Sequence, residues 1–280
     1  ITYSGLSNFN QTLGTGGNTL NILTTATNTA YTITGNGTTP GTTDDIYNIQ
    51  SVANVSTIDI TTAAGTNTVN VGSLAPTITG GTLANILGHI TLTGLGIDTL
   101  NLDDSAATGA KVFTLTATQI NLTGMSAMAY TTIDTLNIDL GSGGITGAIT
   151  STALGTTTTV TTGSGNDNIT INSTSTASTT VETTGGNDTV LVNAIGGPTT
   201  VSVGTGTNSV TVGAATSTII GIVGNLTIAG SGTDTITIDD SADASATTST
   251  LAAGTFSMPT PAQGTIDFSG DTTRVALRTE

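Results

Sequence analysis

Two neighbouring segments decide the fold: Gly186-Asn187-Asp188-Thr189-Val190-Leu191-Val192 and Gly206-Thr207-Asn208-Ser209-Val210-Thr211-Val212. Each begins with a glycine followed by an Asn or Asp, and each continues with valines at every second position. Glycine accepts positive φ, and Asn or Asp can bond to its own backbone, so the first part is typical of a turn. Apolar residues of period two are typical of a strand with one buried face. The segments therefore predict a repeated unit of turn and strand.

The distance between these units predicts how the strands are connected. Units of this kind occur at Asn18, Asp45, Asn67, Asp98, Asp167, Asp188, Asn208 and Asp234. Apart from the gap between Asp98 and Asp167, the shortest interval runs from Asp188 to Asn208 and the longest from Asn67 to Asp98. Intervals of this length suit one coil of a parallel β-solenoid with loops of variable length. The prediction is an all-β, Thr/Gly-rich parallel β-solenoid, or β-helix, with a right-handed coil. β-sandwich repeats are the alternative, because weaker turns also occur at the closer spacing of a sandwich.

The composition excludes several classes of function. The chain of 280 residues contains 70 Thr and 37 Gly, no Cys and no Trp, and a formal net charge of −15. Thr and Gly disfavour helix, and the negative charge argues against nucleic acid or an anionic membrane as partner. No apolar run reaches the length that a membrane helix needs. The core must come from Ile, Val, Leu and Ala, while the Thr, Asn and Asp faces are expected to meet water.

The turn-and-strand units also belong to a longer sequence repeat. The segment Gly94–Ser105 aligns with Gly230–Ser241, and both end in Asp-Asp-Ser. This predicts a first solenoid repeat unit at residues 1–127, a second at 128–265 and the start of a third copy at 266–280. Because the chain starts and stops inside one motif, we expect its ends to match. Solenoids with such ends stack head-to-tail into filaments, so the predicted partner is the chain itself.

These residues resemble a known class of repeats. The string Ile1–Leu6, the units of the form Gly-x-Gly-x-Asp-Thr-Leu-x-Leu and the two Asp-Asp-Ser motifs are similar to repeats in very large bacterial surface and secreted proteins. The resemblance implies an extracellular, non-enzymatic solenoid used as a stalk, filament or adhesin at the cell surface. Cell-surface glycans or proteins are then candidate ligands.

The glycine-aspartate units also resemble the calcium-binding nonapeptide of RTX proteins. That motif needs copies in direct tandem, so that two successive turns close an oxygen cage around Ca²⁺, whereas the copies here are a coil apart. An Asx turn that starts a strand is the simpler interpretation. The alternative is a segment of a calcium-dependent adhesin, and calcium is then the one candidate cofactor. Its candidate ligands are Asp167, Asp188, Asp103, Asp104, Asp239 and Asp240.

The sequence offers little support for catalysis. His89 is the single histidine, and Asn225 replaces it in the second copy. One His and no Cys make a zinc site unexpected, and few aromatic residues are present to bind a sugar beside paired carboxylates. We therefore predict a structural protein that is not an enzyme. Ice binding by a flat threonine face is a further alternative, against which the variable coil length argues.

Overall fold

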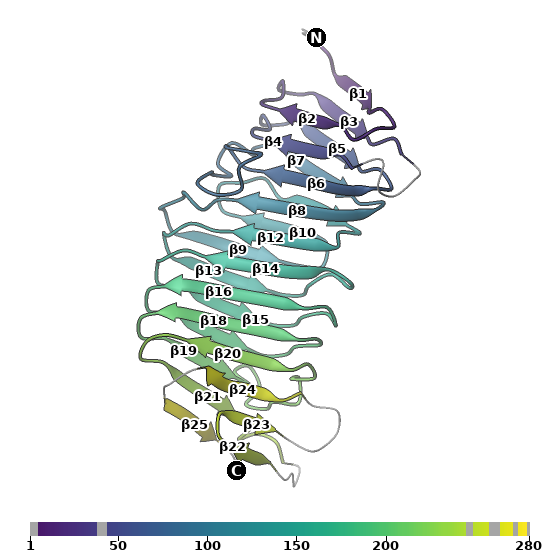
Figure 1. Cartoon of the computed structure of the whole chain (residues 1–280). Coiled ribbons are helices and arrows are strands. Elements are labelled where there is room, and N and C mark those ends of the chain that lie inside the picture. Colours follow the sequence, from purple (N-terminus) through teal and green to yellow (C-terminus); the bar gives the residue numbers. More distant parts are fainter. Residues whose placement is uncertain (1–4, 38–43, 245–248, 258–263, 271–273, 279–280) are drawn as a thin grey trace. The chain divides into compact units, whose positions relative to one another are not determined.

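The computed structural model describes residues 5–37, 44–244, 249–257, 264–270 and 274–278. The regular secondary structure in this part of the chain consists of strands, and they stack in coils (Figure 1). The chain divides into two compact units, which are described separately below. The first contains residues 1–107 and 118–140, and the second contains residues 108–117 and 141–280.

The first unit has strands in two sheets. One sheet contains, in spatial order, β1 (Asn8–Thr12), β3 (Ala30–Thr34), β5 (Thr57–Thr61), β7 (His89–Thr93), β11 (Met128–Thr131) and β10 (Gln119–Leu122). The other contains β2 (Thr19–Ile22), β4 (Ile46–Ile49), β6 (Thr66–Val71), β8 (Ile97–Asp103) and β12 (Thr135–Asp139). From β1 to β8, successive strands of the chain alternate between the sheets, as they do in a coil that winds around a core.

The second unit is built in the same way. One of its sheets contains β9 (Lys111–Leu115), β13 (Ile145–Ile149), β15 (Asn168–Ile171), β17 (Thr189–Val192), β19 (Ser209–Val212), β21 (Thr235–Asp239) and β25 (Arg274–Arg278). The other contains β14 (Thr157–Thr162), β16 (Thr179–Gly185), β18 (Thr199–Thr205), β20 (Leu226–Gly230), β24 (Ile266–Gly270), β23 (Thr255–Ser257) and β22 (Thr250–Ala252).

Pairing between coils is parallel, which confirms the predicted β-solenoid and excludes the β-sandwich. A sandwich is made of antiparallel strands joined by short turns, whereas parallel neighbours need a crossover between them. Here the crossover is the strand of the opposite sheet. Antiparallel pairing occurs at β10–β11, β22–β23 and β23–β24.

The register holds although the coils differ in length. Thr34 pairs with Thr61 and Thr61 pairs with Thr93, even though the second pair is separated by a longer stretch of chain than the first. The extra residues lie in loops, such as the segment 72–88 between β6 and β7. The sequence-based objection that variable coil length spoils the stacking of threonines is therefore wrong.

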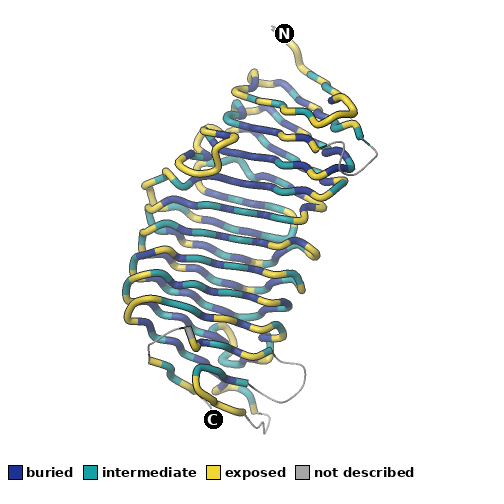
Figure 2. Tube along the Cα trace, in the orientation of Figure 1, coloured by how far each residue is buried: buried dark blue, intermediate teal, exposed yellow. Residues whose placement is uncertain are grey.

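Small aliphatic side chains form the interior. Ile58 and Ile60 of β5, and Val69 and Val71 of β6, are buried, and in β5 the residues beside them are more exposed. Figure 2 shows this alternation between buried and more exposed positions along the strands. At about 25 cal/mol per Å² of apolar surface, the repeated burial supplies stability that the chain obtains without disulfides.

Glycine is required at the turns for close approach as well as for φ. Gly186 and Gly206 have φ of 111° and 135°, values that residues with a Cβ rarely adopt. A Cβ on Gly206 would also collide with the carbonyl oxygen of Gly186, and one on Gly232 with that of Gly206. Consecutive coils therefore touch backbone to backbone at this corner.

The two sequence copies repeat even their irregular features. Ile120 pairs antiparallel with Met128, and Phe256, which aligns with Ile120 in the longer repeat, pairs antiparallel with Ile266. Isolated parallel bridges likewise join Val52 to Ile86 and Ile195 to Ile222. The bounds of the predicted repeat units stay a prediction.

Candidate functional site

A column of Asn and Asp side chains passes through the turns of the first unit. Its members are Asn18, Asp45, Asn67, Asp98 and Asp134. Asp45 Oδ1 accepts hydrogen bonds from both the N–H and the Nδ2–H of Asn18, each at 2.9 Å. Asn67 Oδ1 accepts the N–H of Asp45 at 3.0 Å, and Asn67 Nδ2 donates to Asp98 Oδ1 at 2.9 Å. Asp134 Oδ2 accepts the N–H of Asp98 at 2.8 Å.

The second unit has the same column in Asp167, Asp188, Asn208 and Asp234. The N–H of Asp167 donates to Asp188 Oδ1, and the N–H of Asp188 donates to Asn208 Oδ1, both at 2.9 Å. Asn208 donates to Asp234 Oδ1 through its N–H at 3.2 Å and its Nδ2–H at 2.7 Å. We call these two sets the Asx columns. The side chains join coil to coil, which is more than the local turn that the sequence predicts.

Most members of the Asx columns are buried, whereas Asn18 is half-buried and Asp134 is exposed. Asp98 and Asp234 are 0% exposed and Asp188 is 1% exposed, so the expectation that aspartates face water is wrong for these residues. The sequence places them beside a turn, but stacking of the coils covers them. The Oδ2 atoms of Asp188 and Asp234 are buried with no hydrogen-bond partner among the described residues.

Burial changes the acidity of the column carboxyls. It raises the pKa of Asp98, although hydrogen bonds from Asn67, Gly96 and Thr62 oppose the change. Burial also raises the pKa of Asp167, against hydrogen bonds from Thr162 and from the N–H of Ile145. A low dielectric disfavours the charged form of a carboxyl, so the fold favours protons on these two groups.

A second column, on the sheet of β2, β4, β6, β8 and β12, contains only asparagines. Its members are Asn21, Asn48, Asn70, Asn101 and Asn137. From Asn48 onward, each Nδ2 donates to the Oδ1 of the member one coil nearer the N-terminus, at 2.8 Å for the first bond and 2.9 Å for the other three. We call this set the Asn ladder. An amide carries both a donor and an acceptor, so one residue type can continue the ladder without a break.

The first Asp-Asp-Ser motif closes a turn after β8. Asp103 Oδ1 accepts hydrogen bonds from the N–H and hydroxyl of Ser105, at 3.1 and 2.6 Å. Asp103 Oδ2 accepts the N–H of Gly81 at 2.7 Å, and Asp104 Oδ1 accepts the N–H of Leu83 at 2.9 Å. The two carboxylates therefore hold one loop, residues 80–83.

The second motif repeats this arrangement in the second copy. Asp239 Oδ1 accepts the N–H and hydroxyl of Ser241, at 3.2 and 2.7 Å, and Asp240 Oδ1 accepts the N–H of Ile219 at 3.1 Å. Asp239 Oδ2 also lies 3.6 Å from Arg278 Nη1. The hydrogen bond from the Ser241 side chain is the main cause of a lowered pKa at Asp239, whereas burial raises the pKa of Asp240.

The six predicted calcium ligands thus all have structural contacts. Asp167 and Asp188 do come together, in adjacent coils, and each Asp-Asp doublet converges on one loop. Within the described ranges, no group of three or more His, Cys, Asp or Glu side chains is placed to hold a metal ion. Calcium binding stays a prediction, and the geometry shows carboxylates that accept backbone N–H groups.

The sequence did not reveal Asp134 as a member of the Asx columns. Its surroundings, Asp134-Thr135-Leu136-Asn137, repeat the pattern Asp98-Thr99-Leu100-Asn101, and that spacing could have identified it. His89, which the sequence leaves without a role, starts β7 and donates its N–H to Ser56 O at 3.0 Å.

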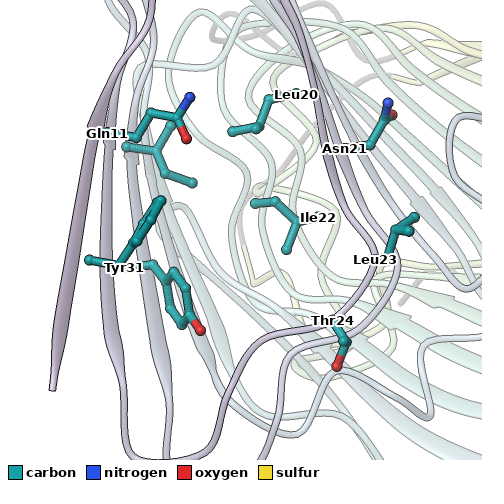
Figure 3. A pocket seen from close by; sticks show the side chains of 9 residues that line it. Gln11, Leu20, Asn21, Ile22, Leu23, Thr24 and Tyr31 are labelled. Carbon is teal, nitrogen blue, oxygen red and sulfur yellow. The ribbon is translucent and has the colours of Figure 1, made fainter. Parts of the chain in front are cut away.

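The first unit also has a cavity of about 390 Å³ at β1, β2 and β3. It is lined by Phe9, Gln11, Leu20, Asn21, Ile22, Leu23, Thr24, Tyr31 and Ile33. In Figure 3, Leu20 and Ile22 point from β2 toward Gln11 and Tyr31 on the opposite side of the hollow. Apolar residues at the matching positions of later coils, such as Val69 and Val71, are fully buried. The cavity therefore lies beside the first described coil of the first unit, where the core residues are less buried than in later coils.

No family model, curated protein or solved structure matches the chain. Among the described residues, no helix is long and apolar enough to cross a membrane. The functional argument therefore depends on the geometry of the chain itself.

Proposed function

We propose that the chain is a structural, non-enzymatic part of an extracellular solenoid, which serves as a section of a filament or stalk at a cell surface. The observation that carries the proposal is the continuous side-chain bonding between coils. The Asx columns and, in the first unit, the Asn ladder add hydrogen bonds to those of the backbone at coil after coil. An extracellular position is supported by the resemblance to repeats of large bacterial surface proteins.

Such bonding suits a protein that must keep its length. A buried amide or carboxylate that loses its partner costs about 1–3 kcal/mol. Separating two coils would leave several such groups without partners and would also break the backbone hydrogen bonds between the strands. The bonds are also spread over successive coils and are not gathered at one site. The chain consists largely of Thr, Gly and small aliphatic residues. These residues form strands and turns and offer few side-chain groups that could take part in catalysis.

We propose further that such chains join end to end. The cavity at β1, β2 and β3 supports this, because it leaves Phe9, Leu20 and Ile22 only partly buried. Within the described residues, β1 and β2 are the outermost strands of their sheets. Edges of outermost strands favour pairing with another chain.

Electron microscopy of the purified chain tests this function. We expect particles whose length increases in multiples of one chain as the concentration rises. The Leu20→Asp variant, which places a charge in this cavity, should remain as single particles and provides the matched control. Discrete single particles of the unaltered chain at every concentration, with and without Ca²⁺, would refute end-to-end assembly.

One observation favours ice binding as a second candidate function. Thr12, Thr34, Thr61, Thr93 and Thr131 form an unbroken row on five neighbouring strands, spaced at about 4.8 Å. A regular row of hydroxyl and methyl groups is what an ordered water layer would need. Thermal hysteresis that the Thr61→Lys variant abolishes would support this function, and its absence in the unaltered chain would exclude it.

A further inference from the structure

One asparagine of the first unit is followed by glycine. The sequence contains a single Asn-Gly pair, Asn36-Gly37, which comes shortly after β3. Every other asparagine precedes a residue that has a side chain. Glycine has no Cβ, so its backbone nitrogen can come close to a neighbouring group. The pair therefore has the residues for one particular reaction, in which the glycine nitrogen attacks the side-chain carbon of the asparagine.

The structure leaves both reacting groups of this pair accessible. Asn36 is exposed. Among the residues that the structure describes, the side-chain amide of Asn36 and the N–H of Gly37 form no hydrogen bond. The backbone on either side is attached to the next coil: Gly35 donates its N–H to Thr61 O at 2.8 Å, and Gly37 O accepts the N–H of Ala64 at 3.2 Å. The pair therefore lies between two anchored points, and its reacting groups are unbonded.

Asparagines of the Asx columns are held in a different way. After Asn67, the N–H of Thr68 donates to Asp45 O at 2.9 Å. After Asn208, the N–H of the following residue donates to Asp188 O at 2.8 Å. The side chains of both asparagines also form hydrogen bonds between coils. The same attack would first have to break these bonds, so the stacking of coils protects Asn67 and Asn208 from it.

We propose that Asn36 is a modification site, at which the folded chain deamidates spontaneously. The nitrogen of Gly37 gives up its proton and bonds to Cγ of Asn36, and the bond from Cγ to Nδ2 breaks, so that Nδ2 leaves with that proton as ammonia. Water then opens the succinimide ring. Opening at Cγ gives aspartate, and opening at the main-chain carbonyl carbon gives isoaspartate. The inference goes beyond the proposed function and does not depend on it.

The reaction changes a contact between two coils. Aspartate adds a negative charge at position 36, and isoaspartate also inserts the β-carbon into the main chain. The longer main chain lies between the bonds to Thr61 O and from Ala64 N–H, so both bonds cannot keep their present geometry. The bond from Ala64 to Gly37 O, at 3.2 Å, is at the long end of the normal range and is the weaker of the two. Formation of isoaspartate therefore releases Gly37 from the coil of β5.

Peptide mapping of the intact chain after storage at neutral pH tests the site. Chymotrypsin releases residues 32–47, between Tyr31 and Tyr47, and this fragment contains Asn36 as its single asparagine. We expect conversion there to be about tenfold or more faster than at Asn67, where the attack must first break a hydrogen bond. Endoproteinase Asp-N, which cleaves before aspartate and not before isoaspartate, distinguishes the two products. Hydrogen exchange at the Ala64 amide should become faster in the stored chain and stay unchanged in the stored Asn36→Gln variant.

The same mapping in guanidinium chloride separates the effect of the fold from that of the Asn-Gly pair itself. Unfolding should accelerate conversion at Asn67 and leave the rate at Asn36 nearly unchanged, because the groups that react at Asn36 are already unbonded in the folded chain. Absence of conversion in the fragment 32–47, or equal acceleration of both asparagines on unfolding, would overturn the inference. Unchanged exchange at Ala64 in chains that carry isoaspartate would show that the contact between coils survives and would overturn its predicted release.

Discussion

Replacing Asn67 by Asp tests whether the Asx columns are integral to the fold. The new side chain has nearly the same shape, but it loses the amide donor to Ala63 O and places a carboxyl where the Nδ2 lay, 2.9 Å from Asp98 Oδ1. Two full charges at 2.9 Å would repel by about 6 kcal/mol at an effective dielectric constant of about 20. The less costly response is to bind a proton at the new carboxyl.

The proton makes the penalty depend on pH. Protonating a carboxyl whose ordinary pKa is about 3.9 costs about 1.4 kcal/mol for each pH unit above that value, which is about 4 kcal/mol at pH 7 and about 1.5 kcal/mol at pH 5. The lost amide bond adds about 1 kcal/mol at either pH. Because the folded-state pKa is raised, the variant is most stable below the unfolded pKa and loses stability as pH rises.

Urea unfolding followed by circular dichroism at pH 5 and pH 7 measures this difference. We expect the Asn67→Asp variant to lose about 2.5 kcal/mol at pH 5 and about 5 kcal/mol at pH 7. The Asn67→Leu variant should lose a similar amount at both pH values, and the exposed Asn8→Ala variant should lose little. An equal loss for Asn67→Asp at pH 5 and pH 7 would refute the reasoning.

The same contacts give three further predictions. The pKa values of Asp98 and Asp167 are raised, so their contribution to stability is complete below the ordinary pKa of 3.8 and falls as pH rises through the folded-state values. The melting temperature should therefore be higher at pH 4 than at pH 7. A melting temperature that rises from pH 4 to pH 7 would contradict this prediction. Millimolar Ca²⁺ should leave the melting temperature unchanged, because Asp103, Asp104 and Asp167 already accept hydrogen bonds; a rise that Asp167→Asn abolishes would establish the calcium site that the sequence suggests. Gly206→Ala should cost about 3 kcal/mol or more in unfolding experiments, since φ is 135° and a Cβ meets Gly186 O, whereas Gly109→Ala, with open space around it, should cost little.

The identity of the strands was within reach of the sequence, and the bonding between them was not. Val190 and Val192 indicate a strand by their alternation, and the glycine before Asp188 indicates a turn. These are local properties, which depend on residues within a few positions of one another. The partners of Asp188 are Asp167 and Asn208, 21 and 20 residues away, and no local pattern states which atoms of the three will meet.

For the same reason, the sequence does not show what the two Asp-Asp-Ser motifs contact. Adjacent carboxylates suggest a cation, and the longer repeat shows only that the unit carries them. Gly81 and Leu83 precede Asp103 and Asp104 by 22 and 21 residues, and their N–H groups become donors only when the coils stack. Which backbone N–H groups bond to these carboxylates therefore depends on a loop that the motif does not contain.

By itself, the sequence determined an all-β solenoid of small aliphatic residues with glycine corners, because period-two alternation and turns about one coil apart leave few other ways to bury the apolar face. The tertiary structure decided which polar groups are inside, which of them join one coil to the next, and which loops absorb the unequal coil lengths. Burial and hydrogen bonding between coils are properties of residues that are distant in the chain, and they exist only once one coil lies on another.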